Sequence, residues 1–188
     1  MISRTLALST IAAIASLGAC ASSQAEPVTS SSDMQMPAFT SMSTSADVLN
    51  AEGEPAGTLT ATSAPGGVIL RVALEPGTLT PGWHGLHLHQ NSDCSDTGVF
   101  KLSGGHVGKV EGGHGLLNPA GPEGGDLPNI HAAMDGSASA EMFSPRIELA
   151  SLMAGGGFAM IIHEGPDDHI TQPIGGAGGR VACAAVKS

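Results

Sequence analysis

Trp83-His84-Gly85-Leu86-His87-Leu88-His89 is the most informative stretch of this sequence. We interpret it as a β-strand, in which every second side chain lies on the same face. His87 and His89 therefore point the same way, and two imidazoles on one rigid face form half of a transition-metal site. The other half is expected downstream, from four further residues: His106, His114, Asp126 and His163.

Short strand-like runs recur on both sides of this stretch, with Gly and Pro turn signals between them. The predicted strands are residues 58–62, 68–74, 83–89, 130–134, 138–143, 158–163 and 181–186. Long helical patterns are scarce, and residues 147–153 are expected to form one or two helical turns. Many short strands predict an all-β, antiparallel sandwich or barrel.

No strand is predicted between residues 90 and 127. Such a long irregular segment in a compact domain needs a physical explanation. A disulfide at one end and bound metal in the middle would supply it.

The N-terminal residues 1–19 are expected to be a signal peptide. Arg4 supplies a positive charge, and the apolar residues 6–17 are too few to span a bilayer. Leu17-Gly18-Ala19-Cys20 resembles a bacterial lipobox, which implies cleavage before Cys20 and lipidation of its thiol. An ordinary secretory signal with a chance cysteine is the alternative.

Residues 20–44 have almost no periodicity and are rich in Ser, Thr, Ala, Met and Pro, which predicts a lipidated flexible tether. Residues 45–188 then form one folded domain. Because Ala21 and not Asp follows Cys20, we expect an exported protein anchored to the outer membrane and facing the periplasm, in a cell with two membranes.

The chain has three cysteines, and export implies an oxidising compartment. If Cys20 carries lipid, Cys94 and Cys183 remain as a pair. A bond between them would close a loop of about 90 residues and contribute roughly 4 kcal/mol by chain-entropy arguments. A thiolate metal ligand is the alternative.

The net charge of −10 makes nucleic acid an unsuitable partner. Lys101, Lys109 and Arg180 stand in or near the histidine-rich segments. A local positive patch there would draw in a small anion.

Taken together, the order, spacing and flanking residues of the histidines resemble the copper-zinc superoxide dismutases, specifically the bacterial exported type. The resemblance covers roughly residues 45–187, and its most specific stretches are residues 82–89, 125–129, 163–168 and 175–183. It implies an eight-stranded antiparallel Greek-key barrel, an immunoglobulin-like sandwich, with a long metal-binding loop and a long electrostatic loop.

The resemblance also implies a role for each site residue. The expected copper ligands are His87, His89, His106 and His163. His106 would bridge copper to a zinc ion held by His114 and Asp126, and would deliver a proton during catalysis. Asp167 would link a copper histidine to a zinc histidine, Arg180 would attract superoxide, and Cys94 and Cys183 would form a disulfide.

The family's third zinc histidine is missing from this chain. Glu123 stands nine residues after His114 and three before Asp126, which fits the family spacing with glutamate in that histidine's place. Glutamate oxygen is a legitimate zinc ligand, so the predicted zinc set is His106, His114, Glu123 and Asp126. A competing alignment of residues 121–124 would instead make this a short deletion that removed the ligand.

Three other histidines are not expected to bind metal. His84 matches a structural histidine of the family, His131 is expected to face solvent or the core, and His169 is expected to be a surface residue.

The predicted function is dismutation of superoxide to oxygen and hydrogen peroxide by copper redox cycling, beside a variant zinc site. Two alternatives stay open: a copper-only dismutase with a degenerate zinc site, and a non-enzymatic copper-binding lipoprotein. Arg180 argues against the second, because a storage protein has no need for it. Bacterial relatives occur as monomers and as dimers, so a homodimer is neither required nor excluded.

Overall fold

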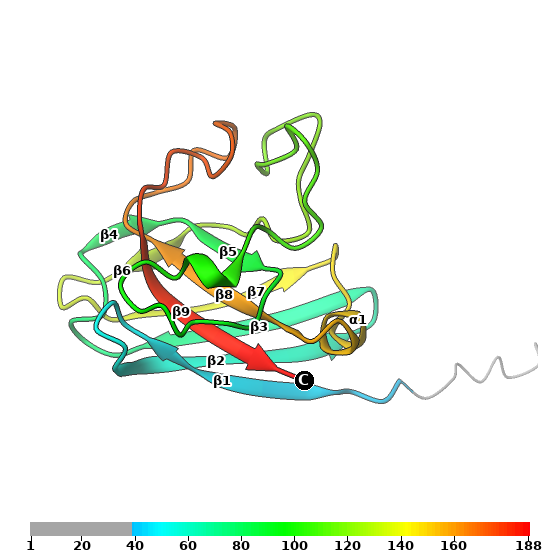
Figure 1. Cartoon of the computed structure of the whole chain (residues 1–188), viewed down its shortest axis with the longest axis horizontal. Coiled ribbons are helices and arrows are strands. Elements are labelled where there is room, and N and C mark those ends of the chain that lie inside the picture. The colour runs from blue at the N-terminus through cyan, green and yellow to red at the C-terminus, as the bar shows by residue number, and fades with distance from the viewer. Residues whose placement is uncertain (1–38) are drawn as a thin grey trace, which may run out of the picture. The chain divides into compact units, whose positions relative to one another are not determined.

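The computed structural model describes residues 39–188. The predicted signal peptide, Cys20 and the tether up to residue 38 lie outside the described residues. Almost every regular element is a strand (Figure 1). The elements are β1 (Ser43–Leu49), β2 (Pro55–Ala64), β3 (Gly67–Leu74), β4 (Gly82–His84), β5 (Leu86–His89), the 3-10 helix η1 (Lys101–Ser103), β6 (Ile130–Ala132), β7 (Ala138–Ser144), α1 (Leu149–Ala154), β8 (Gly157–His163) and β9 (Arg180–Lys187).

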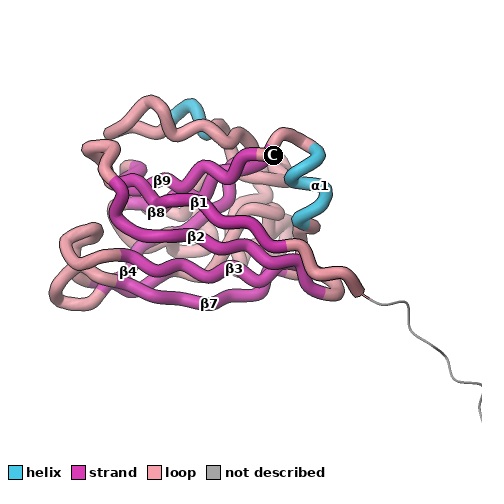
Figure 2. The backbone as a smooth tube through the Cα atoms, turned by 90° about the horizontal axis from the view of Figure 1, so that it is seen from below, coloured by secondary structure: helices cyan, strands magenta, loops and turns pink. Residues whose placement is uncertain are grey.

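Seven strands form one curled sheet in the order β5-β8-β9-β1-β2-β3-β7, and β4 pairs with β6 in a second, two-stranded sheet (Figure 2). Every pair is antiparallel. The predicted all-β antiparallel fold is therefore confirmed, as is the short helix near residues 147–153. Within the described residues, no helix is long and apolar enough to cross a membrane.

The predicted strand at residues 83–89 is divided at Gly85 into β4, which pairs with β6, and β5, which pairs with β8. A side chain at Gly85 would come within 2.9 Å of the Ala177 Cβ and 3.2 Å of the Asp167 Cβ. The backbone needs glycine here because the β8–β9 loop packs directly against it. With β4 and β5 taken as one bent strand, residues 39–188 contain the eight strands that the resemblance implies.

The core lies inside the curl of the sheet and is almost entirely aliphatic. Leu86 and Leu88 of β5 have no exposed surface and belong to the main hydrophobic cluster, as do Leu70 of β3 and Ile162 of β8. Because side chains alternate across a strand, burying the two leucines places His87 and His89 on the other face of β5. The core thus fixes the orientation of the first two histidines.

Two long loops rise from the same side of the sheet (Figure 1). The first, residues 90–129, contains no strand, as predicted, and its one helical element is η1. The second loop is residues 164–179. A disulfide between Cys94 and Cys183 ties the first loop to β9, with the two Cα atoms 5.9 Å apart. The thiolate-ligand alternative for these cysteines is therefore wrong.

Strand β1 was not among the predicted strands, and its first two residues fall in the segment predicted as a tether. Its register with β2 pairs Ser43 with Thr62 and Asp47 with Thr58. Only Val48 of this strand is fully buried in the core, so its sequence lacks the apolar alternation that marks a strand.

Candidate metal centre

The predicted metal ligands converge although they come from distant parts of the chain. Backbone pairing of His87 with Asp126 and of His89 with His106 brings the first long loop onto β5. His163 lies at the end of β8, the strand that pairs with β5. Eight predicted site residues are buried together: His87, His89, His106, His114, Glu123, Asp126, His163 and Asp167.

Four buried imidazole nitrogens on one side of this cluster have no hydrogen-bond partner: His87 Nδ1, His89 Nε2, His106 Nε2 and His163 Nε2. The rings are close, with centroids 4.3 Å apart for His87 and His106 and 4.8 Å apart for His87 and His163. Buried polar atoms without partners cost free energy. Four nitrogens gathered in this way fit a copper ion.

The opposite nitrogen of three of these rings is anchored. His87 Nε2 lies 2.9 Å from Asp167 Oδ2, His89 Nδ1 lies 2.9 Å from the Gly104 carbonyl, and His163 Nδ1 lies 3.1 Å from the Gly178 carbonyl. Oxygen can only accept, so each anchored nitrogen carries the proton. The lone pair of each ring therefore faces the shared space.

Burial also keeps these imidazoles neutral. It lowers the pKa of His87 and of His163 to about 4, and that of His89 to about 2. The nearby His106 and Arg180 add to the effect on His89. Metal ligands must be deprotonated, so the ligand nitrogens are ready to bind metal at neutral pH.

A second donor set lies on the far side of His106. The Nδ1 atom of His106 is 2.8 Å from Glu123 Oε2 and 3.1 Å from Asp126 Oδ1, and the latter oxygen is 2.8 Å from His114 Nδ1. Neither contact to His106 Nδ1 has hydrogen-bond geometry. His106, His114 and Asp126 offer donor atoms within 4.8 Å of one another, and imidazole nitrogen and carboxylate oxygen are donors that zinc takes.

The profile described as "Copper/zinc superoxide dismutase (SODC)" matches residues 55–186 of this sequence. This chain belongs to the copper/zinc superoxide dismutase family. A "Superoxide dismutase [Cu-Zn]" from Caulobacter vibrioides is 47% identical over 152 residues, which cover 77% of this chain and 86% of the relative.

Solved structures agree with this result. The Cu/Zn superoxide dismutase from Brucella abortus matches with a TM-score of 0.64 and 31% identity, over 78% of this chain and all of that one. A SOD-like protein from Bacillus subtilis matches with a TM-score of 0.65 and 31% identity, over 76% of this chain and 97% of that one.

In this member of the family, the Asp126 carboxylate is held ionised. Burial alone would raise its pKa, but the contact with His106 and the backbone N–H groups of Gly115 and Glu123 outweigh burial and lower it to about 2. Those N–H groups donate to Asp126 Oδ2 at 2.8 and 2.9 Å. The loop backbone thus fixes one carboxylate oxygen and leaves the other beside the histidines.

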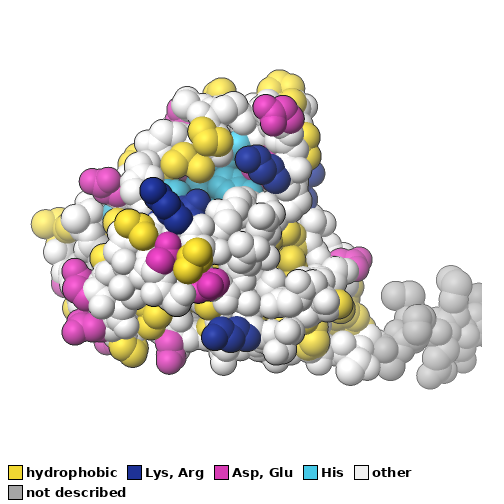
Figure 3. All heavy atoms as spheres, viewed as in Figure 1, with side chains coloured by type: hydrophobic (Ala, Val, Ile, Leu, Met, Phe, Trp, Pro, Cys, Tyr) yellow, Lys and Arg dark blue, Asp and Glu magenta, His cyan; other side chains and the backbone are white. Residues whose placement is uncertain are grey.

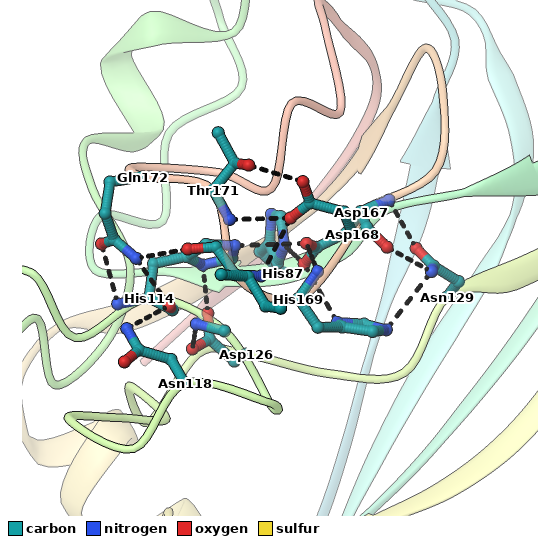
Figure 4. A network of polar contacts seen from close by, with 12 residues as sticks. His87, His114, Asn118, Asp126, Asn129, Asp167, Asp168, His169, Thr171 and Gln172 are labelled. Atoms are coloured by element: carbon teal, nitrogen blue, oxygen red, sulfur yellow. Dashed lines mark hydrogen bonds and ion pairs between the residues drawn. The ribbon is translucent and has the colours of Figure 1, made fainter.

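Asp167 joins the two donor sets of the dismutase centre (Figure 4). Its Oδ2 atom accepts from His87 Nε2 at 2.9 Å, and its Oδ1 atom lies 3.3 Å from His114 Nε2. The hydrogen bond from His87 is the largest of the effects that outweigh burial and hold the pKa of Asp167 well below its usual range. A carboxylate in this position fixes the tautomer and orientation of both rings.

Three residues of this network were not identified from the sequence as site residues. Asn129 clamps the Asp167 backbone, donating to its carbonyl at 2.8 Å and accepting from its N–H at 2.9 Å. Gln172 clamps the His114 backbone in the same way, at 2.8 and 3.1 Å. His169 was expected on the surface, but it is half-buried and its Nδ1 atom lies 3.4 Å from Asp167 Oδ2.

Arg180 lines a small pocket of about 130 Å³ whose wall also includes His89, His106, Lys109 and Glu123. Its guanidinium donates to the Phe100 carbonyl at 2.6 Å and to the Gly104 carbonyl at 3.0 Å. Lysine and arginine side chains flank the exposed histidine surface at this hollow (Figure 3). Lys109 thus belongs to the predicted positive patch at the pocket, whereas Lys101 is exposed on η1 and is not part of the pocket wall.

The remaining two histidines lie apart from the unpaired nitrogens. His84 places its ring between the carbonyl oxygens of His163 and Thr80, each 2.8 Å away. His131 is exposed and contacts Trp83 edge-on, with ring centroids 4.9 Å apart.

Proposed function

We propose that this chain catalyses the dismutation of superoxide, in which two superoxide ions and two protons give oxygen and hydrogen peroxide. The observation that carries the proposal is the group of four unpaired histidine nitrogens beside a cation-lined pocket. His87, His89, His106 and His163 would hold copper. When bound, copper would supply the one-electron redox couple of the reaction.

Arg180 and Lys109 are assigned to capture of the superoxide anion. Both line the pocket that reaches His106, in a chain whose net charge is −10. A fixed cation in a cleft focuses the electric field and raises the association rate of a small anion. Three acceptors around the Arg180 guanidinium restrict its position. The side chain therefore loses less conformational entropy when it binds superoxide.

His106 is assigned to proton transfer. Its Nδ1 atom faces the two carboxylates, while Nε2 is unpaired and faces the copper histidines. Because His106 also lines the pocket, its Nε2 atom can carry a proton to the reduced product whenever that atom is not bound to copper. Asp167 keeps His87 and His114 in the tautomers that this arrangement requires.

We assign Glu123 to the zinc site together with His106, His114 and Asp126. The side chain of Glu123 is only 4% exposed and its Oε2 atom is 2.8 Å from His106 Nδ1. Its other oxygen accepts the Val110 N–H at 3.0 Å, which holds the carboxylate in this direction. A buried, oriented carboxylate supports the alignment in which Glu123 replaces the third zinc histidine, and not the alignment in which that ligand is deleted. It also supports an enzyme with a complete zinc site, and not a copper-only enzyme.

Metal analysis of purified protein, run beside a superoxide dismutation assay, tests both assignments. Wild type should contain one copper and one zinc per chain and should be active. His163→Ala should lose copper and activity. Full activity in His163→Ala would contradict the copper site.

Glu123→Ala should weaken zinc binding by at least about 10- to 100-fold, because loss of a group that only orients a metal ligand already costs that much. Glu111→Ala is the matched control, because it removes an exposed carboxylate from the same loop. Equal zinc affinity in the Glu123 variant and in wild type would exclude Glu123 as a ligand.

We further propose that the domain is exported and held to the bacterial envelope by lipid on Cys20, in the outer membrane and facing the periplasm. The lipobox-like stretch at residues 17–20 and the Cys94–Cys183 disulfide support export. Mass spectrometry of the mature N-terminal peptide should find acylated Cys20.

Sedimentation of the folded domain, residues 45–188, would distinguish a monomer from a homodimer.

A further inference from the structure

Ser103 is a fully buried polar residue of η1 whose hydroxyl lies between two parts of the proposed centre. Its Oγ atom is 2.9 Å from Arg180 Nη1 and 3.2 Å from His89 Nδ1. We propose that Ser103 is a positioning residue that holds the Arg180 guanidinium in the pocket wall in the orientation that captures superoxide. This inference rests on the proposed function, in which Arg180 binds the anion.

The hydroxyl uses all of its hydrogen-bonding capacity. A serine hydroxyl has one proton to donate and two lone pairs that accept. Ser103 donates its proton to the Phe100 carbonyl at 2.7 Å, so both lone pairs are left to accept. Arg180 Nη1–H faces one of them at 2.9 Å. His89 Nδ1–H donates mainly to the Gly104 carbonyl at 2.9 Å and reaches the Ser103 hydroxyl at 3.2 Å only as the weaker branch of a shared hydrogen bond.

Arg180 is held at three points, and Ser103 supplies the one that comes from a side chain. Nη1 has two protons, which reach the Phe100 carbonyl and the Ser103 hydroxyl, and Nη2 reaches the Gly104 carbonyl. Alanine at residue 103 would leave one Nη1 proton without its acceptor and would introduce no larger group. The two carbonyls would remain, so Arg180 should become more mobile without leaving the pocket.

Chemical labelling of arginine measures this directly. Metal-loaded wild type and Ser103→Ala are treated with phenylglyoxal, and the rate of labelling at each arginine is read by peptide mass spectrometry. Arg180 should react roughly three- to tenfold faster in the variant, which is the size expected for loss of one hydrogen bond. Arg71 and Arg146, which are exposed, serve as internal controls and should react at unchanged rates.

Kinetics then show whether the contact acts through Arg180. Ser103→Ala should lower kcat/KM by roughly three- to tenfold while copper content stays at the wild-type value. In an Arg180→Ala background the same substitution should have no further effect on kcat/KM. Ser103→Gly also lacks the hydroxyl and should repeat both results if the alanine variant folds poorly.

Three results would overturn the inference. One is unchanged labelling of Arg180 in Ser103→Ala, and another is equal acceleration at all three arginines, which indicates general loosening. The third is an equal loss of kcat/KM with and without Arg180, which would mean that Ser103 acts through His89. The assignment of Arg180 to anion capture fails separately, if Arg180→Ala alone leaves kcat/KM unchanged, and dismutation itself is tested by His163→Ala. The labelling result depends on neither outcome.

Discussion

Each imidazole of the copper side uses its two nitrogens differently. In His87, His89 and His163 one nitrogen donates to an oxygen and the other has no partner in the described structure. The oxygen partner decides which nitrogen keeps the proton, so three separate contacts determine that three lone pairs converge. These contacts therefore orient the donor nitrogens of the copper side independently of one another.

Arg180 allows the sharpest prediction at the scale of one residue. Arg180→Ala should lower kcat/KM by about 10-fold or more and leave bound copper unchanged, because the residue acts on the anion and not on the metal. The dependence of the rate on ionic strength should weaken, since a steering charge acts through a screened field. Stopped-flow assays at several salt concentrations measure both quantities.

Arg146→Ala is the control for this prediction, because it removes one exposed positive charge outside the pocket that Arg180 lines. Similar rates and salt dependence in wild type and Arg180→Ala would show that Arg180 does not steer the substrate.

At the scale of elements, the sheet and core place the histidines of β5 and β8, and the two long loops supply most of the remaining donors. The loops are joined to each other by side-chain amides: Asn129 and Gln172 each clamp the backbone of a residue on the opposite loop. A ligand on an irregular loop has no ladder of backbone hydrogen bonds to hold it. The side-chain amides of Asn129 and Gln172 therefore hold the loop backbone in place, as backbone hydrogen bonds do in a strand.

Gln172→Ala tests this role of the loop contacts. The substitution removes two hydrogen bonds to the His114 backbone and one to the Ile170 carbonyl, at roughly 1 kcal/mol each. We expect zinc to dissociate about 10-fold faster, because His114 loses its fixed position while its ring remains. Zinc release into a chromogenic chelator measures the rate.

Gln90→Ala is the control and should release zinc at the wild-type rate, since Gln90 is an exposed glutamine at the start of the first long loop, which also carries His114. Identical zinc release from wild type and Gln172→Ala would mean that the clamp does not hold His114.

The candidate metal donors could be predicted from the sequence because their spacing is regular, both along a strand and in the pattern of the family. His87 and His89 follow from the period of a strand, and Glu123 follows from its separation from His114 and Asp126. Ser103, Asn129 and Gln172 were missed because a polar loop residue carries no periodic signal, and its partner is a backbone group far along the chain. The same absence of pattern explains why β1, with Val48 as its only fully buried side chain, went unpredicted.

At the scale of the whole molecule, the Cys94–Cys183 disulfide stabilises both fold and site. It joins residues 89 positions apart and by chain entropy contributes about 4 kcal/mol. It also anchors the start of the segment that includes Phe100 and Gly104, whose carbonyls hold Arg180. Replacing both cysteines by Ser should therefore lower the unfolding free energy by about that amount and also lower kcat/KM.

Urea denaturation and steady-state assays of the Cys94→Ser, Cys183→Ser protein measure these two effects. Loss of stability without any loss of kcat/KM would show that the disulfide supports the fold alone and does not help to place Arg180.

The metal-free protein should lose stability as the pH falls from about 6.5 toward 4. Burial lowers the pKa of His87 and His163 from 6.5 to about 4, and that of His89 to about 2. In this window the unfolded chain binds protons that the folded chain rejects, so each group lowers the unfolding free energy by up to roughly 1.4 kcal/mol per pH unit. The stability that these neutral histidines contribute is complete above pH 6.5.

Thermal denaturation of the metal-free protein between pH 4.5 and 7.5 measures this slope. His131→Ala should keep it, because that histidine is exposed, whereas His163→Gln should reduce it by removing one of the buried groups. Equal stability at pH 5 and pH 7 would show that the ligand imidazoles are solvated in the metal-free state. The metal-loaded protein should resist acid further, because its ligands can be protonated only as metal leaves.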